Sequence, residues 1–238
     1  MTYSAIARCA RTGRLGIGVA SYTMAIGAYC DGAIRPNVGA TVTQGFPLPR
    51  NNRLAMNLLA QGCTPAIAME ALAANDRQHE YRQVAIVDRE GAALAHTGRY
   101  VRAPAGQRTG AGYAICGTTI KNEGVLDAMA DAFESQSGTD LEDRLLVVLE
   151  AGRDAGGLIG ASGPLPERSV AVIVWGTRDY SDFDLRVDMQ EGAIEQLRRI
   201  YVDYKPTAQY YEERARHPRN AIPSMEFADM LKGQQEAS

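Results

Sequence analysis

Short apolar runs with strand-like composition open the chain, and apolar residues at helical spacing follow them. Runs of β-branched and small apolar residues, with glycine nearby, predict strands at Tyr3–Cys9, Leu15–Ser21, Ala28–Ile34 and Gly39–Gln44. A helical stripe closed by Gly62 then predicts a helix at 49–62. A second helix at 64–75 begins with a Thr64 cap and a first-turn proline.

The second half of the chain repeats this alternation. Further strands are predicted at Arg82–Asp88, Ala92–Thr97, Gly112–Gly117, Ser169–Trp175 and Phe183–Val187. Further helices are predicted at Glu123–Glu134, Leu141–Ala155 and Gly192–Val202. Strands, a helix pair, strands, a helix pair and strands again predict an antiparallel α+β domain with helices stacked on two packed sheets.

The composition changes after Tyr204, where the chain becomes polar and contains three prolines. We therefore expect one globular domain over residues 1–203 and a C-terminal arm with one or two short helices over 204–238. The aromatic and methionine residues of the arm need cover. The expected assembly is a homo-oligomer in which the arm contacts a neighbour; a loosely ordered tail is the alternative.

Composition and charge exclude several classes of protein. A net charge of −3 gives no basic surface bias, so we expect no nucleic-acid partner. No apolar stretch approaches the ~20 residues that span a bilayer, and no signal peptide precedes the first strand, so we expect a cytoplasmic protein. The four cysteines and three histidines show no metal-ligand spacing, so neither a metal nor another cofactor is expected.

Thr2 is the strongest chemical signal, because methionine is normally trimmed before so small a residue. The mature chain would then begin with a hydroxyl and a free α-amine on one residue. Such a residue holds both halves of a nucleophile–base pair, since the amine can take the hydroxyl proton. No Gly-x-Ser-x-Gly elbow or phosphate-binding lysine loop competes with it, and Gly110-x-Gly112 precedes a strand instead of opening a helix.

Many short blocks, in order, resemble a bacterial family of unknown function numbered 1028. The blocks lie within about residues 2–203 and include Thr2–Arg8, Thr12–Gly16, Val19–Ser21, Ala25–Ala28, Thr43–Gln44, Pro49–Arg50, Glu80–Val84, Val87–Asp88, His96–Gly98, Gly110–Ala114, Val125–Met129, Arg144–Leu146 and Ala155–Gly157. The resemblance implies a four-layer αββα sandwich like that of N-terminal-nucleophile hydrolases, with two stacked, mostly antiparallel sheets. The chain departs from the family pattern at Cys9, at Thr118 and in the loop 158–169, so either its substrate differs from that of most members or its activity is lost.

Together, these features predict a hydrolase that cleaves a C–N bond in a small-molecule amide, cyclic imide or ureide. Thr2 would be the nucleophile and its amine the base, with Ser21 orienting the amine. Backbone N–H groups, Gln44 or Thr118 would stabilise the oxyanion.

Two further residues, Arg82 and His96, could hold a substrate carboxylate. For Arg82, an ion pair with Glu80 or Asp88 is an equal alternative, and for His96 a half-buried structural role is favoured.

Two alternatives stay open at this point. The nucleophile could be Ser4, Ser169 or Cys9, although Cys9 would point to the opposite face of its strand from Thr2. The chain could also be a non-catalytic ligand-binding or structural homo-oligomer on the same scaffold. In either case, strand-end polar residues are expected to line one cleft, namely Thr2, Ser21, Gln44, Arg82, His96, Thr118 and Ser169.

Overall fold

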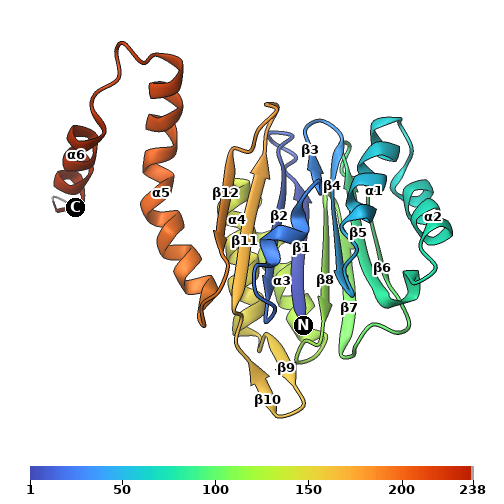
Figure 1. Ribbon diagram of the computed structural model, residues 1–238. Helices are drawn as coiled ribbons and strands as arrows, with labels where there is room; N and C mark the ends of the chain where they lie inside the picture. Colours follow the sequence, from blue (N-terminus) through green and yellow to red (C-terminus); the bar gives the residue numbers. More distant parts are fainter. Residues whose placement is uncertain (237–238) are drawn as a thin grey trace. The chain divides into compact units, whose positions relative to one another are not determined.

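The structure is a computed structural model that describes residues 1–236. Within these residues the chain is a mixed α+β protein with six α-helices and antiparallel sheets of six, four and two strands (Figure 1). The predicted antiparallel α+β class is therefore confirmed. The chain divides into two compact units, with the boundary between Leu197 and Arg198.

The six-stranded sheet places the N-terminal strand at its centre. Its strand order is β12-β11-β2-β1-β8-β7. The bounds are β1 Thr2–Arg8, β2 Leu15–Ser21, β7 Ala105–Gly110, β8 Tyr113–Thr118, β11 Ser169–Trp175 and β12 Phe183–Val187. Because β1 lies between β2 and β8, both of its edges are hydrogen-bonded.

The four-stranded sheet has the order β3-β4-β5-β6 and packs against the larger sheet through β1–β4 and β5–β8 contacts. Its strands are β3 Ile34–Arg35, β4 Gly39–Gly45, β5 Arg82–Asp88 and β6 Ala93–Thr97. The two-stranded sheet is a separate hairpin of β9 Leu158–Gly160 and β10 Gly163–Leu165.

Helices cover the outer face of each large sheet (Figure 1). The bounds are α1 Arg50–Ala60, α2 Pro65–Asn75, α3 Gly124–Ser135 and α4 Leu141–Asp154. Helices α1 and α2 pack on β4, β5 and β6, while α3 and α4 pack on the six-stranded sheet. Gly16 on β2 permits the close approach of α4, since a Cβ there would lie 2.7 Å from Leu145 Cδ1. The Thr64 cap of α2 is confirmed, because its hydroxyl accepts from Ile67 N.

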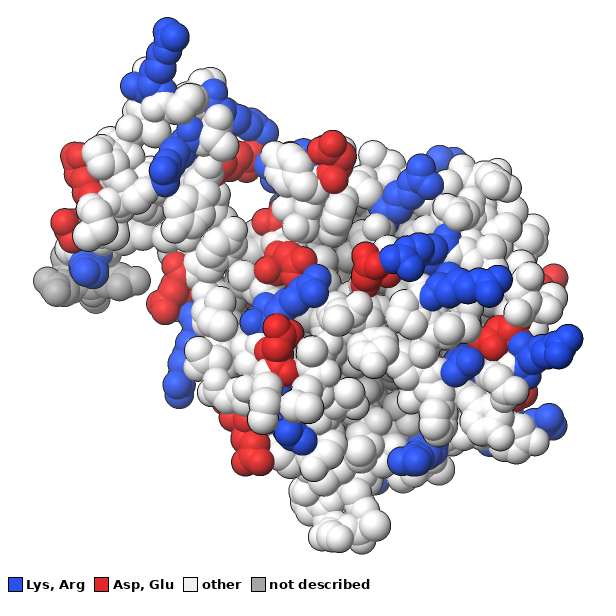
Figure 2. All heavy atoms as spheres, in the orientation of Figure 1, with Lys and Arg blue, Asp and Glu red and all other residues white. Residues whose placement is uncertain are grey.

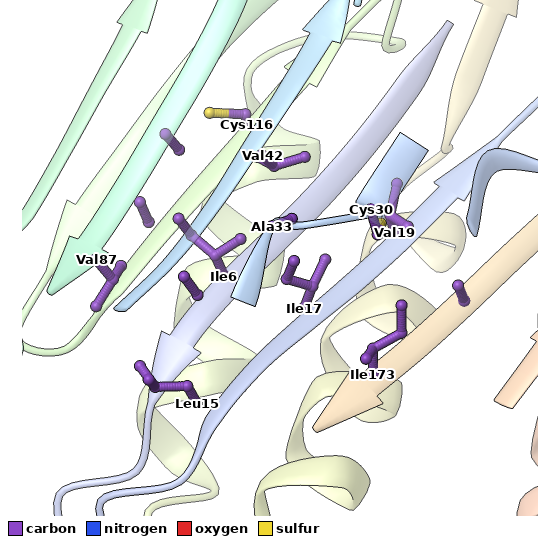
Figure 3. Close-up of a cluster of buried hydrophobic side chains, with 14 of the residues drawn as sticks. Ile6, Leu15, Ile17, Val19, Cys30, Ala33, Val42, Val87, Cys116 and Ile173 are labelled. Carbon is purple, nitrogen blue, oxygen red and sulfur yellow. The ribbon is translucent and has the colours of Figure 1, made fainter. Parts of the chain in front are cut away.

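An apolar core fills one part of the space between the sheets (Figure 3). Ile6 and Ile17 project into it from the six-stranded sheet, and Val42 and Val87 from the four-stranded sheet. Side chains alternate between the two faces of a strand. The same alternation therefore directs every second residue of β1 and β2 into this space, including those beyond the apolar part.

Some predicted elements differ from the structure. The predicted strand Ala28–Ile34 instead begins within a 3-10 helix, Ile26–Cys30, and continues as a turn, because backbone N–H groups there bond to carbonyls three residues earlier. Ala25, with a positive φ of 53°, begins this turn. Strand β7 was missed because it contains only small and polar residues and lies at a sheet edge. The helix predicted to end at Val202 continues as α5, Ala193–Arg216, through Pro206.

The second unit contains most of α5 and all of α6, Ser224–Glu236. The two helices are tied together within this unit. Tyr210 stacks on Phe227 with ring centroids 3.9 Å apart, and its hydroxyl donates to Ile222 O at 2.8 Å. The arm is therefore helical over a longer stretch than the sequence pattern indicates.

Charge is mixed along the chain, with 25 basic and 28 acidic residues. Figure 2 shows the two signs interspersed over the visible face of the first unit, without a large patch of either sign. None of the helices in the described part of the chain is long and apolar enough to cross a membrane.

Candidate functional site

A row of four hydroxyl side chains crosses the four central strands of the six-stranded sheet at one end of those strands. In the strand register Ser169 is opposite Ser21, Ser21 is opposite Thr2, and Thr2 is opposite Thr118. Residues directly opposite in an antiparallel pair project from the same face. This face is the one from which Ile6 enters the core, so the hydroxyls face the four-stranded sheet.

Thr2 and Ser21 form the centre of this row. Their hydroxyl oxygens lie 2.9 Å apart, and Ser21 Oγ donates to Met1 O at 2.8 Å. A serine hydroxyl has a single proton, so with that proton on Met1 O the Thr2 hydroxyl is the donor to Ser21. Thr23 N donates to Ser21 Oγ as well, at 3.0 Å. Ser21 is thus saturated, while the lone pairs of Thr2 Oγ1 accept no hydrogen bond in the part of the chain that the structure describes.

Buried amide side chains continue the polar region onto the opposite sheet. Gln44 Nε2 donates to Thr2 O at 3.4 Å and to Gln83 Oε1 at 2.6 Å. Gln83 Nε2 in turn donates to Thr97 Oγ1 at 2.8 Å, and the Thr97 hydroxyl donates to Gln107 Oε1. Gln44 also accepts from Ser4 at 2.7 Å. The end of the inter-sheet space that holds Thr2 is therefore polar, in contrast to the core around Ile6.

The outer members of the hydroxyl row hold backbone segments in place. Ser169 Oγ donates to Thr23 O at 2.5 Å and accepts from Ile26 N at 3.1 Å, which fixes the 3-10 turn. Thr118 Oγ1 donates to Arg102 O at 3.1 Å. Both hydroxyl protons are thus committed to main-chain carbonyls.

A small cavity opens at the start of β1, with a volume of about 160 Å³. It is lined by Met1, Thr23, Gly45, Phe46, Arg102, Thr118 and Thr119. Burial and the nearby positive charge of Arg102 lower the pKa of the Met1 α-amine. An amine in this position therefore loses its proton more readily than an ordinary chain terminus.

Thr119 is conformationally strained where it borders this cavity. Its φ of 57° lies in the left-handed region, which β-branched residues rarely adopt. Its Oγ1 is buried without a hydrogen-bond partner in the described residues. Strained residues and unsatisfied polar atoms concentrate at functional sites. Sequence reasoning missed both Thr119 and Arg102, and no sequence pattern marks either of them.

The structure does not bring Arg82 or His96 to this cavity. Both lie on the face of the four-stranded sheet that carries Val84, which packs against α1 and α2. Arg82 pairs with Asp76 at 3.0 Å, instead of Glu80 or Asp88, and donates to the carbonyl of Phe46.

His96 stacks on His79 with ring centroids 4.3 Å apart. This outward placement follows from strand alternation, since Gln83 and Thr97 occupy the inward positions. Of the seven residues expected to line one cleft, only Thr118 lines this cavity. Thr2, Ser21, Gln44 and Ser169 lie together in the buried polar region beside it, whereas Arg82 and His96 lie on the helix-covered face of the four-stranded sheet.

The histidine pair makes stability depend on pH. Burial and then the neighbouring His96 lower the pKa of His79 below that of an unfolded histidine, about 6.5. The unfolded chain thus binds more protons in that range, so the free energy of unfolding should fall as pH drops through about 6.5 and below. Urea unfolding between pH 5 and 8 would measure the slope, and His96→Gln should flatten it. An unchanged slope in that variant would contradict the assignment.

The alternative nucleophiles occupy different places. Ser4 lies beside Thr2 on the same face, but its hydroxyl is committed to Gln44 at 2.7 Å. Cys9 is buried and follows the far end of β1, beyond Arg8. Thr2, Ser4 and Cys9 are all buried and outside the lining of the cavity, but Thr2 is the one bonded directly to Met1, which does line it. No cluster of three or more His, Cys, Asp or Glu side chains in the described part of the chain could hold a metal ion.

The structure thus defines an α+β protein whose N-terminal strand is central in a sheet, with a polar cavity at the start of that strand. The chain belongs to the family of unknown function DUF1028, which matches residues 2–197. A crystal structure of a protein of the same family from Silicibacter pomeroyi is similar to it, with 28% sequence identity and a TM-score of 0.75. The likeness covers 85% of this chain and 88% of that one. No curated protein shows significant similarity to the chain.

Proposed function

We propose that the protein is a hydrolase that cleaves a C–N bond in a small-molecule amide, cyclic imide or ureide, with Thr2 as its N-terminal nucleophile. The carrying observation is that the hydroxyl row meets the chain terminus at a cavity. The proposal includes the four-layer αββα arrangement of N-terminal-nucleophile hydrolases. Helices on the outer faces of two facing antiparallel sheets support that arrangement.

The chemistry begins with removal of Met1, which frees the amine of Thr2. The amine takes the hydroxyl proton while Thr2 Oγ1 attacks the substrate carbonyl carbon. The proton then passes to the leaving nitrogen as the C–N bond breaks, and an ester on Thr2 remains. Water activated by the same amine hydrolyses that ester. Ser21 Oγ lies 2.9 Å from Thr2 Oγ1, which supports a role for Ser21 in orienting the nucleophile. Its bond to Met1 O is lost when Met1 is removed, which frees the Ser21 hydroxyl for the new amine.

The surroundings of the terminus suit both roles of the amine. The amine must be unprotonated to act as a base. Burial and then the charge of Arg102 lower the pKa of the Met1 amine, so the same end of β1 supports an unprotonated amine. Gln44 and Thr118 are less suited to the oxyanion than expected, because Gln83 and Arg102 O already engage them. Thr119, whose hydroxyl has no partner in the described residues, is a hydroxyl donor still free at the cavity.

A second candidate is a non-catalytic ligand-binding or structural homo-oligomer on the same scaffold. The observation that favours it is that the members of the buried polar network bond mainly to one another and to the backbone. Gln44, Gln83 and Ser169 each satisfy neighbouring groups in the way a structural buried network does. In this case the amine of Thr2 would have no chemical role, and Met1 could be retained without consequence.

Intact-mass measurement of the purified chain separates these two candidates. We expect the mass to be lower than that of the full sequence by one methionine residue, with Thr2 as the first residue on N-terminal sequencing. A chain that retains Met1 would keep the nitrogen of Thr2 in an amide bond. Since an amide nitrogen is no base, that outcome would contradict the Thr2 mechanism.

We also propose that the protein is a homo-oligomer in which the C-terminal arm contacts a second copy. The arm exposes large apolar side chains, including Met225 at 76% and Met230 at 51%. Such surfaces are commonly interfaces. Truncation after Tyr204 should therefore reduce the mass measured by light scattering, whereas Met24→Gln, at an exposed methionine of the first unit, should not. An unchanged assembly after truncation would contradict the proposal.

A further inference from the structure

Three exposed aromatic rings lie together beside the cavity, and we call Phe46, Tyr81 and Tyr100 the aromatic shelf. Phe46 meets Tyr81 edge-on with centroids 5.7 Å apart, and Tyr81 lies 4.8 Å from Tyr100. The rings are 42%, 38% and 50% exposed in chain order. Large aromatic side chains are usually buried, so three exposed rings in mutual contact mark a binding surface.

The backbone beneath the shelf is held in place by hydrogen bonds. Phe46 N donates to Tyr81 O at 3.2 Å, and Tyr100 N donates to Glu80 O at 2.9 Å. Arg82 also donates to Phe46 O. Gly98 allows the chain to pass close to Glu80, because a Cβ there would lie 2.4 Å from Glu80 O. The rings are thus presented from a fixed backbone, which limits the entropy lost when a ligand binds.

Two arginines flank the shelf, and only one of them is paired. Arg99 lies over Tyr100 at 4.8 Å and is also 4.0 Å from Glu80 Oε2. Arg102 lies 5.7 Å from the Phe46 ring centroid and lines the cavity. It makes no ion pair with any side chain in the described part of the chain. Arg102 therefore presents an uncompensated positive charge where the shelf joins the cavity.

The size of the cavity determines where a ligand must extend. Its volume of about 160 Å³ is below the roughly 300 Å³ at which ligand pockets usually begin. A substrate can therefore place only its reacting end inside. Phe46 belongs to both the cavity and the shelf, so the rest of the substrate has a continuous path from one to the other.

We propose that the ligand of this site is an amide that carries both a carboxylate and a planar ring. Its carboxylate pairs with Arg102, which offers two parallel donors to such a group. Its ring lies against Phe46 and Tyr81, which provide stacking and edge contacts. The uncharged amide, which is the reacting end, lies between these two contacts inside the cavity, since both Arg102 and Phe46 line it. The proposal deepens the hydrolase assignment by naming its substrate class, but the binding itself requires no turnover.

Calorimetric titration of the full chain with three matched probes tests this proposal. N-Benzoylglycine has the ring, the amide and the carboxylate; benzamide lacks the carboxylate, and N-acetylglycine lacks the ring. N-Benzoylglycine should bind at least about tenfold more tightly than either fragment, since each lost contact is worth about a factor of ten. Equal binding of all three probes, or no saturable binding of N-benzoylglycine, would overturn the proposal.

Single substitutions test which side chain contacts the carboxylate and which contacts the ring. Arg102→Gln should weaken N-benzoylglycine and N-acetylglycine about tenfold and leave benzamide unchanged, because only the carboxylate contact is lost. Phe46→Leu should weaken the two ring-bearing probes alone. Arg35→Gln, an exposed arginine on β3, is the matched control and should change nothing. A loss in Arg102→Gln that is the same for benzamide would refute the carboxylate assignment.

Turnover is recorded separately by proton NMR on the same mixtures. If the probes bind with the expected pattern but no amide is hydrolysed, the hydrolase proposal is contradicted and the proposed ligand class is supported. If uncharged amides are hydrolysed but N-benzoylglycine does not bind, the hydrolase proposal is supported and the proposed ligand class is contradicted. The two proposals can therefore fail independently.

Discussion

Replacing Thr2 with alanine should lower the rate of amide hydrolysis by roughly 10³-fold or more, because it removes the nucleophile of the proposed reaction. The fold should persist, since the change deletes one hydroxyl and its 2.9 Å bond to Ser21, worth about 1 kcal/mol of unfolding free energy. Rates with a substrate of the proposed class and urea unfolding of the same preparation measure both effects.

Two matched variants make the Thr2 result specific. Thr2→Ser keeps a hydroxyl beside Ser21 and should retain most activity. Ser4→Ala removes a neighbouring hydroxyl on the same face, bonded to Gln44, and should cost stability without eliminating turnover. If Thr2→Ala kept full activity while Ser4→Ala lost it, the nucleophile would be Ser4.

Replacing Gln83 with leucine should lower the free energy of unfolding by roughly 3–5 kcal/mol, the range for breaking a buried polar network. Gln83 is fully buried and bonds to Gln44, to Thr97 and to the carbonyls of Gly106 and Gly117. Leucine would remove every one of these bonds from the space between the two sheets, although Gln44 keeps its contacts with Ser4 and Thr2 and Thr97 its contact with Gln107. Urea unfolding monitored by circular dichroism would measure the loss.

The exposed glutamine Gln78, changed to alanine, is the control for the Gln83 variant. It should shift stability by no more than about 0.5 kcal/mol, as surface substitutions usually do. A loss of under 1 kcal/mol in Gln83→Leu would mean that the network contributes little, and that the sheets are held together mainly by the apolar core around Ile6.

Hydrophobic patterning predicted most of the first unit because its strands and helices bury one face each. The positions of β1, β2, β5 and β11 follow from runs of apolar residues that lie in the core. Strand β7 carries no such run, since all its residues are half-buried or exposed. The turn at Ala25 depends on a left-handed backbone that alanine does not signal in sequence. Local composition therefore predicts buried strands and misses edges and unusual turns.

The candidate site was predictable only where it depends on strand ends. Thr2, Ser21, Thr118 and Ser169 each begin or end a strand, and the register brings them into one row. Arg82 also begins a strand, but the alternation of β5 directs it to the helix-covered face.

The residues that join the cavity to the shelf could not be inferred in this way. Arg102 lies outside any strand, and its position depends on how the chain passes from β6 to β7. Long-range placement of this kind has no local sequence signal.

The central position of β1 also constrains when its first residue can be processed. The strand is synthesised first, yet its partner β8 ends at Thr118 and the neighbouring β11 ends at Trp175, so the sheet closes only after most of the chain has emerged from the ribosome. Once it closes, Ser21 Oγ and Tyr22 N both hold the carbonyl of Met1. Under the proposed function we therefore expect Met1 to be removed faster from the growing chain than from protein refolded with Met1 in place.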